Sequence, residues 1–236
     1  MSQLKLGIIG GGQLGSMLST AAKKLNIKSV VYSDDIDAPA QKFCDEFIFS
    51  EYDNKEKILE LVSKVDVITY EFENIPFETL NEINKLKPVV PKPSVNRLIQ
   101  HRLAEKDFIN KLNIRTTRYV SIEKKSDIET LEDFLPGILK TTTMGYDGKG
   151  QYPIKKIEDL NSLNIDFSKG YILEKLVKLK KEISVIITRF GKQKYEIYEP
   201  IENEHSDQIL KFSKIPAKID QTIINNSKDA AKKISE

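Results

Sequence analysis

The chain has 236 residues, of which 39% are hydrophobic, so it can form one large globular domain or two smaller ones with packed cores. Lys and Arg total 37 and Asp and Glu total 35, which leaves a net charge of +2 and argues against a nucleic-acid partner. The single cysteine, Cys44, excludes an internal disulfide framework. We find no signal peptide and no apolar run long enough to span a membrane, so we expect a cytoplasmic protein without a membrane partner.

Strand and helix patterns alternate in the first part of the chain. Apolar runs predict strands at residues 4–9, 30–32, 46–49, 65–69 and 89–90. Apolar residues at helical spacing predict helices at residues 14–25, 54–62 and 77–86. This alternation indicates an α/β domain with a parallel sheet covered on both faces. Three prolines then follow, and Ser94 is the predicted N-cap of a further helix, so we place a domain boundary near residues 93–98.

The second part of the chain has an α+β pattern. Helices are predicted at residues 104–112, 128–134 and 221–236. Short strands are predicted at residues 118–120, 137–140, 171–174, 182–189 and 195–198. The charged segment 154–159 has the composition of a solvated connection.

A glycine-rich loop at residues 140–151 is the most informative segment. It contains Gly145, Gly148 and Gly150, with Lys140 and Lys149 on its two sides. Glycines let the backbone approach a ligand closely, and ammonium groups attract phosphate oxygens. The pattern therefore suits a cover over a bound phosphate, although a structural hairpin could use the same glycines.

A second glycine motif, residues 10–15, has the form G-x-G-x-x-G between a predicted strand and a predicted helix. Asp34 and Asp35 follow at about the distance at which a dinucleotide site keeps its ribose carboxylate. Three interpretations stay open on this pattern: a nicotinamide or flavin site, a site for another phosphate-bearing ligand, and a structural turn.

Several carboxylates and one histidine are further candidates. Glu71 and Glu73 follow a strand at the carboxyl edge of the predicted sheet, where they could hold ribose hydroxyls or cap the next helix. Glu174 and Glu182 end and begin neighbouring strands, where they could bind a nucleoside or Mg²⁺ or form surface ion pairs. His205 lies in a polar run typical of a solvated loop, and two histidines with one cysteine are a poor metal-ligand set.

In order and spacing, these motifs resemble those of the N5-carboxyaminoimidazole ribonucleotide synthases, ATP-grasp carboxylating enzymes of purine biosynthesis. The resemblance extends over essentially all 236 residues. The segments that carry it are residues 10–18, 68–76, 102–106, 140–151, 174–177, 182, 202–205 and 209–210.

The resemblance implies a fold and a set of site residues. Residues 1–97 would form a Rossmann-like pre-ATP-grasp domain that binds the ribonucleotide rather than NAD. Residues 98–236 would form an ATP-grasp domain that lacks its C-terminal part, with a lid at about 114–177. The residues implied at the ATP site are Arg102, Lys140, Gly145, Tyr146, Asp147, Gly148, Lys149, Gly150, Gln151, Glu174, Lys175, Leu176, Val177, Glu182 and His205. Those implied at the ribonucleotide site are Gln13, Leu14, Glu73, Tyr146 and Lys149, of which Tyr146 and Lys149 would be catalytic.

The implied reaction uses ATP, Mg²⁺ and bicarbonate to carboxylate 5-aminoimidazole ribonucleotide through carboxyphosphate, in a homodimer. Two departures from the family pattern bear on this expectation. Met144 stands where relatives commonly have glycine, and the family's metal ligands and phosphate-binding segment lie beyond the position of Glu236. We therefore expect the chain as given to be catalytically inactive. The alternatives are another ATP-grasp carboxylase or ligase, and a nucleotide-binding module without catalysis.

Overall fold

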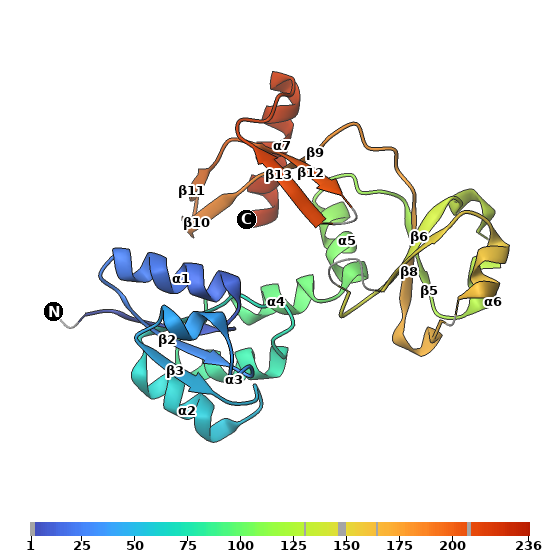
Figure 1. Cartoon of the computed structure of the whole chain (residues 1–236). Coiled ribbons are helices and arrows are strands. Elements are labelled where there is room, and N and C mark those ends of the chain that lie inside the picture. Colours follow the sequence, from blue (N-terminus) through green and yellow to red (C-terminus); the bar gives the residue numbers. More distant parts are fainter. Residues whose placement is uncertain (1–2, 130, 146–149, 164, 207–208) are drawn as a thin grey trace. The chain divides into compact units, whose positions relative to one another are not determined.

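The computed structural model describes residues 3–129, 131–145, 150–163, 165–206 and 209–236. The chain divides into two compact units, Met1–Gln100 and His101–Glu236, which are considered separately below (Figure 1). Among the described residues, no helix is both long and apolar enough to cross a membrane.

The first unit is a four-stranded parallel sheet with the strand order β3-β2-β1-β4. Its strands are β1 (Lys5–Ile9), β2 (Lys28–Ser33), β3 (Glu46–Phe49) and β4 (Val67–Tyr70). The helices that connect or follow them are α1 (Gln13–Lys24), α2 (Lys55–Lys64) and α3 (Phe77–Leu86). The predicted parallel-sheet α/β domain is confirmed.

Alternate residues of the central strands enter two different cores. Ile8 and Val31 pack with Ala40 on one side of the sheet. Ile9 and Val30 belong to a larger cluster with Leu61 and other side chains of α2 and α3. Because successive side chains of a strand point to opposite faces, the apolar runs of β1 and β2 require cover on both faces, which the helices provide.

The end of the first unit differs from two predictions. The expected strand at residues 89–90 is reduced to one parallel bridge between Ile68 and Val89, next to two prolines that cannot donate ladder hydrogen bonds. The predicted N-cap at Ser94 is wrong. Helix α4 (Pro93–Ile99) begins at Pro93, with Lys92 as the capping residue, because proline's fixed φ suits the first helical position.

The second unit begins with α5 (Arg102–Lys111) and a four-stranded antiparallel sheet of order β5-β8-β6-β7. Its strands are β5 (Tyr119–Ile122), β6 (Gly137–Thr141), β7 (Gln151–Ile154) and β8 (Tyr171–Lys175). Leu139, Leu173 and Ile122 form the core on one face, together with Ile128 of α6 (Lys125–Glu129). The solvated connection predicted at 154–159 is wrong at its start, because Ile154 is fully buried at the end of β7.

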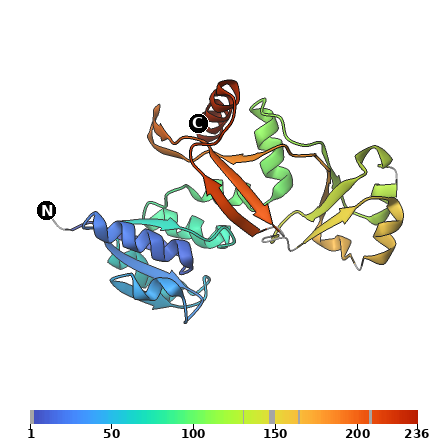
Figure 2. The same cartoon turned by 45° about the horizontal axis from the view of Figure 1, so that its top comes forward.

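The last part of this unit contains more strands than predicted. β9 (Glu182–Ser184), β12 (Ile201–Ser206) and β13 (Ile209–Lys214) form a sheet of order β13-β12-β9. β10 (Ile187–Gly191) and β11 (Lys194–Ile197) form a hairpin, so the single strand predicted at 182–189 is two strands. The predicted helix at 128–134 is likewise split, into α6 and a 3-10 turn (Glu132–Phe134). Helix α7 (Gln221–Ser235) packs against β10 (Figure 2).

Candidate nucleotide site

The β5-β8-β6-β7 sheet has one apolar face and one face that carries polar and charged groups. Glu174 on β8 is directly opposite Tyr119 on β5 and Ile138 on β6, so these three side chains share a face. Lys140 lies two residues beyond Ile138 and therefore points to the same face. The intervening residues Leu139 and Leu173 point into the core. Strand register alone thus places a lysine diagonally next to a carboxylate.

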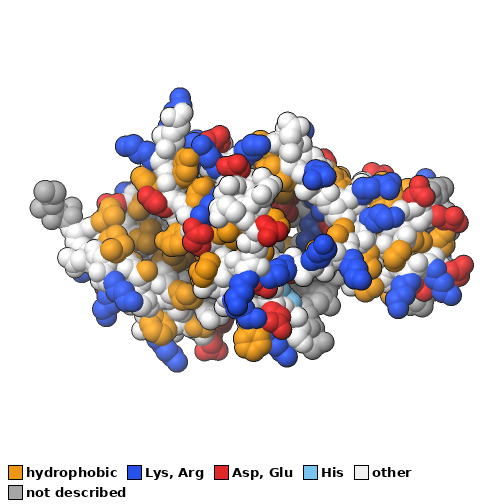
Figure 3. All heavy atoms as spheres, turned by 90° about the horizontal axis from the view of Figure 1, so that it is seen from above, with side chains coloured by type: hydrophobic (Ala, Val, Ile, Leu, Met, Phe, Trp, Pro, Cys, Tyr) orange, Lys and Arg blue, Asp and Glu red, His pale blue; other side chains and the backbone are white. Residues whose placement is uncertain are grey.

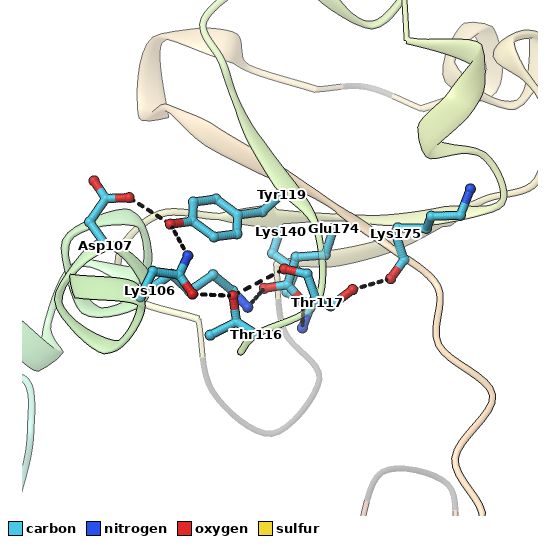
Figure 4. Close-up of polar contacts among 9 residues, drawn as sticks. Lys106, Asp107, Thr116, Thr117, Tyr119, Lys140, Glu174 and Lys175 are labelled. Atoms are coloured by element: carbon cyan, nitrogen blue, oxygen red, sulfur yellow. Dashed lines mark hydrogen bonds and ion pairs between the residues drawn. The ribbon is translucent and has the colours of Figure 1, made fainter. Parts of the chain in front are cut away.

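Glu174 lies between two lysines, Lys140 and Lys106 (Figure 4). The Lys140 Nζ donates to Oε2 at 2.8 Å, and the Lys106 Nζ lies 3.2 Å from Oε1. Glu174 is 7% exposed, and the side chains of Lys140 and Lys106 are 17% and 16% exposed, respectively. One carboxylate between two ammonium groups leaves a net positive charge in a largely buried place, which an incoming anion such as a phosphate would balance.

The electrostatic balance keeps Glu174 ionised. Burial raises the pKa of Glu174, but the hydrogen bond and charge of Lys140, with those of Lys106, outweigh it and hold the pKa below its ordinary value. Glu105, on the same helix as Lys106, has a raised pKa because burial disfavours its charge and Glu174 repels it. Within the group of Glu174, Lys140 and Lys106, two ammonium groups thus face one ionised carboxylate.

Helix α5 contributes a residue that sequence reasoning did not assign. Lys106 lies four residues after Arg102, so both side chains lie on one side of α5. Lys106 also lies over the Tyr119 ring, 5.4 Å from its centroid. Tyr119 donates to Asp107 Oδ1 at 2.6 Å and accepts from Asn110 Nδ2 at 2.8 Å. The spacing from Arg102 was the sequence signal that could have identified Lys106.

The glycine-rich loop joins β6 to β7, and Lys140 pairs with Gln151 at its base. Arg102 holds the first side of the loop, since its Nη2 donates to Gly145 O at 2.8 Å and its backbone N–H donates to Thr142 O at 2.9 Å. Gly150 has a φ of +70° and Met144 a φ of +56°, so both residues adopt the left-handed conformation that favours glycine. The predicted residues Tyr146, Asp147, Gly148 and Lys149 lie outside the described residues.

The predicted hinge, residues 174–177, runs from the end of β8 into an exposed segment. Thr117 Oγ1 donates to Lys175 O at 2.7 Å, and Lys175 N donates to Arg118 O at 2.9 Å. Leu176 and Val177 follow, with exposed fractions of 52% and 53%. The backbone is thus fixed by hydrogen bonds where two apolar side chains are free to contact the flat face of a base.

Glu182 and His205 form a second small group, on β9 and β12. Glu182 is directly beside Asn203 in the ladder, and His205 Nδ1 lies 3.3 Å from Glu182 Oε2. The solvated loop expected around His205 is wrong, because residues 201–206 form a strand of the sheet. The structure thus brings together two side chains that lie on different strands and are distant along the chain.

In the first unit, Glu71 occupies the start of helix α1. Its Oε1 accepts from Gly12 N at 2.8 Å, where Gly12 is the N-cap and supplies no capping side chain of its own. Gly10 has a φ of +105°, and a Cβ there would lie 2.9 Å from Glu71 Oε1. The carboxylate thus takes the position that the pyrophosphate of a dinucleotide would need, which argues against the NAD interpretation.

The residues expected to bind the ribonucleotide lie around this helix start. Gln13 and Leu14 are exposed in the first turn of α1, and Glu73 is exposed in the loop after β4. Glu71 is engaged with the glycine loop, whereas the exposed carboxylate of Glu73 is available to a ligand.

Each of the two units matches a known family of protein domains. Residues 3–100 match the model of the ribonucleotide synthetase preATP-grasp domain, and residues 107–236 match that of the ATP-grasp domain. The chain belongs to the ATP-grasp family. Its predicted architecture, a Rossmann-like preATP-grasp domain followed by an ATP-grasp domain, is confirmed, and the structure shows that the sheets of the second domain are antiparallel.

Several relatives of this ATP-grasp chain have the same name. An N5-carboxyaminoimidazole ribonucleotide synthase of Staphylococcus aureus is 36% identical over 92% of the chain and 59% of its own length. One of Brucella melitensis is 34% identical over 97% of the chain and 65% of its own length. Crystal structures of such synthetases with ADP match with TM-scores of 0.92 and 0.91 at 32% and 34% identity, over 100% and 99% of the chain and 64% and 63% of theirs. The chain thus spans about three fifths of the length of these relatives.

Two further observations concern the charged and metal-ligating side chains of the ATP-grasp chain. Basic and acidic side chains both occur over the face drawn in Figure 3, as the near balance of the two charge types predicts. Within the part of the chain that the structure describes, no three His, Cys, Asp or Glu side chains are grouped closely enough to hold a metal ion.

Proposed function

We propose that the protein of which this chain is the sequence is an N5-carboxyaminoimidazole ribonucleotide synthase. It would use ATP and bicarbonate to carboxylate the amine of 5-aminoimidazole ribonucleotide. The observation that carries the proposal is the buried arrangement of Lys140, Glu174 and Lys106 beside the glycine-rich loop. The names and the ADP complexes of the relatives support it.

The second unit would bind ATP. Its ATP-grasp domain would comprise residues 98–236, with a lid at about 114–177. Lys140, Arg102 and the glycine-rich loop would face the phosphates, with Lys149 and Tyr146 closing over the reacting groups. The exposed Leu176 and Val177 would contact adenine. Glu182 would accept hydrogen bonds from the ribose, with His205 beside it.

The first unit, residues 1–97, would bind the ribonucleotide. Gln13 and Leu14 are exposed where the glycine motif meets α1, and Glu73 is exposed at the carboxyl end of the sheet. Open parallel sheets bind ligands at this edge. Glu71 would keep the glycine loop in shape rather than contact ligand, since its Oε1 is already bonded to Gly12.

In the proposed reaction, a bicarbonate oxygen attacks the γ-phosphorus and ADP leaves, which gives carboxyphosphate. Carboxyphosphate releases CO₂ and phosphate, and the amine of the ribonucleotide forms a bond to the CO₂ carbon and loses a proton. Phosphoryl transfer of this kind depends mostly on positioning and on neutralising charge. Lys140 and Arg102 would neutralise phosphate charge, and the closed loop would keep water from the short-lived intermediate.

Mg²⁺ would neutralise further phosphate charge in such an enzyme. The described residues do not supply a ligand set for it, so we derive no step through the metal from this chain. The homodimer that the family resemblance implies is likewise part of the proposal for the whole protein.

Assay of the whole protein for ADP release tests the proposal. We expect release that requires both bicarbonate and 5-aminoimidazole ribonucleotide, and a loss of at least about 100-fold in kcat/KM for Lys140→Met, by analogy with removal of one charge-stabilising group. ADP release that depends on another carboxylate or amine substrate would indicate a different ATP-grasp ligase. Nucleotide binding without any turnover by the whole protein would indicate a binding module.

A further inference from the structure

The cluster of Lys106, Glu174 and Lys140 contains one lysine more than the carboxylate needs. A single ammonium group would neutralise Glu174, yet Lys140 and Lys106 bind one oxygen each. The two lysines come from different elements, Lys140 from β6 and Lys106 from α5. The arrangement therefore needs a reason beyond neutralising the carboxylate.

The two lysines are held differently. Lys106 lies between the Glu174 carboxylate and the face of Tyr119, and Asp107 and Asn110 fix the hydroxyl of that ring. Within the described residues, the ammonium group of Lys140 makes its one ion pair with Glu174, and Lys140 lies at the base of the glycine-rich loop, where it pairs with Gln151. Lys106 is thus fixed from two sides, whereas Lys140 is held at one contact at the base of the loop.

We propose that Lys106 is the permanent counter-ion of Glu174, which frees Lys140 to leave this carboxylate for a nucleotide phosphate. A buried carboxylate that loses its one partner is strongly unfavourable, so without Lys106 the transfer of Lys140 would be opposed. With Lys106 in place, Glu174 stays paired before and after nucleotide binding. Lys106 would then be a positioning residue, and it would not touch the nucleotide.

This inference rests on the proposed ATP site and is tested by calorimetry on the chain with ATP and with adenosine. We expect Lys106→Met to weaken ATP binding at least tenfold and adenosine binding less than twofold, since adenosine draws no lysine away. Lys106→Arg keeps the charge and should retain ATP affinity within about threefold. Lys111→Met, which removes an exposed charge from the last turn of the same helix, is the matched control and should change neither affinity.

A double-mutant cycle separates this role from direct phosphate contact. In the Glu174→Gln background no carboxylate remains to be paired, so adding Lys106→Met should change ATP affinity less than twofold. An equal loss in both backgrounds would overturn the inference in favour of phosphate contact, and an equal loss of adenosine binding in the single variant would reduce Lys106 to a structural role. If Glu174→Gln does not fold, the ATP and adenosine affinities of Lys106→Met and Lys106→Arg still test whether Lys106 acts as the counter-ion of Glu174. Failure of the unsubstituted chain to bind ATP would instead contradict the proposed ATP site.

Discussion

Two glycines in the second unit differ in whether a side chain can be added. Gly150 has a φ of +70°, and a Cβ there would lie 2.5 Å from Thr141 Oγ1. At Gly191 the nearest atoms to an added Cβ are side-chain carbons of Lys194 at 3.5 Å, an ordinary contact. We expect Gly150→Ala to lower the free energy of unfolding by about 1–3 kcal/mol, because left-handed backbone strain adds to the steric clash. Gly191→Ala should change it by less than about 1 kcal/mol in the same urea titration, and equal losses would refute the strain assigned to Gly150.

Glu174 makes the stability of the second unit depend on pH in the acid range. Its pKa in the folded chain lies below the ordinary value, so the ionised carboxylate stabilises the fold above the unfolded pKa. That contribution is lost as the pH falls from the ordinary glutamate pKa through the lower folded value. We expect Glu174→Gln to lower the free energy of unfolding at pH 7 by about 3 kcal/mol and to flatten its acid-range slope.

Urea titrations between pH 3 and 7 would measure this dependence. Glu196→Gln, at an exposed position on β11 of the same unit, serves as the control and should follow the unsubstituted chain. Parallel pH curves for the unsubstituted chain and Glu174→Gln would show that the two lysines do not stabilise the carboxylate.

At the scale of elements, helix α1 depends on a strand distant in sequence. Its N-cap Gly12 has no side chain, and Glu71 from the end of β4 supplies the acceptor for the Gly12 N–H. A carboxylate at a helix start gains from the helix dipole as well as from the hydrogen bond. We expect Glu71→Ala to lower the free energy of unfolding of the first unit by about 1–2 kcal/mol.

Glu73→Ala is the matched control, since it removes an exposed carboxylate from the same loop. Under the proposed function the two variants should diverge in calorimetry with 5-aminoimidazole ribonucleotide. Glu73→Ala should weaken ribonucleotide binding without changing the free energy of unfolding. Glu71→Ala should lower the free energy of unfolding of the first unit. Equal stability losses for both variants would contradict the cap.

The helices and strands with a clear periodic pattern could be predicted from sequence. For the candidate sites, single residues and motifs could be predicted, but not the contacts between them. Predicted bounds for β3 and α3 agree with the structure because their apolar patterns are continuous and their ends are marked. β12 was not predicted, since its polar residues have no apolar alternation and the strand is defined by pairing with β9 and β13. Lys106 was not assigned for a similar reason, because its contact with Glu174 joins elements far apart in the chain.

At the scale of the whole molecule, each unit has its own core and its own proposed ligand. The first unit ends at Gln100 and the second begins at His101, and both match separate family models. Domains with separate cores unfold as separate cooperative units unless their interface is large. The chain is therefore expected to show two thermal transitions, with Glu71→Ala lowering the transition of the first unit and Gly150→Ala that of the second.

ADP should shift one of these transitions and leave the other in place. A ligand stabilises only the state that binds it, by about 2.7 kcal/mol when its concentration is 100 times its Kd. The proposed ATP residues, from Arg102 to His205, all lie in the second unit, so the transition that Gly150→Ala lowers is the one that ADP should raise. Calorimetric scans of the two variants with and without ADP give this assignment directly. A shift of the transition marked by Glu71→Ala would instead place the nucleotide at the glycine motif of the first unit. It would reopen the dinucleotide interpretation of that motif, against which the position of the Glu71 carboxylate argues.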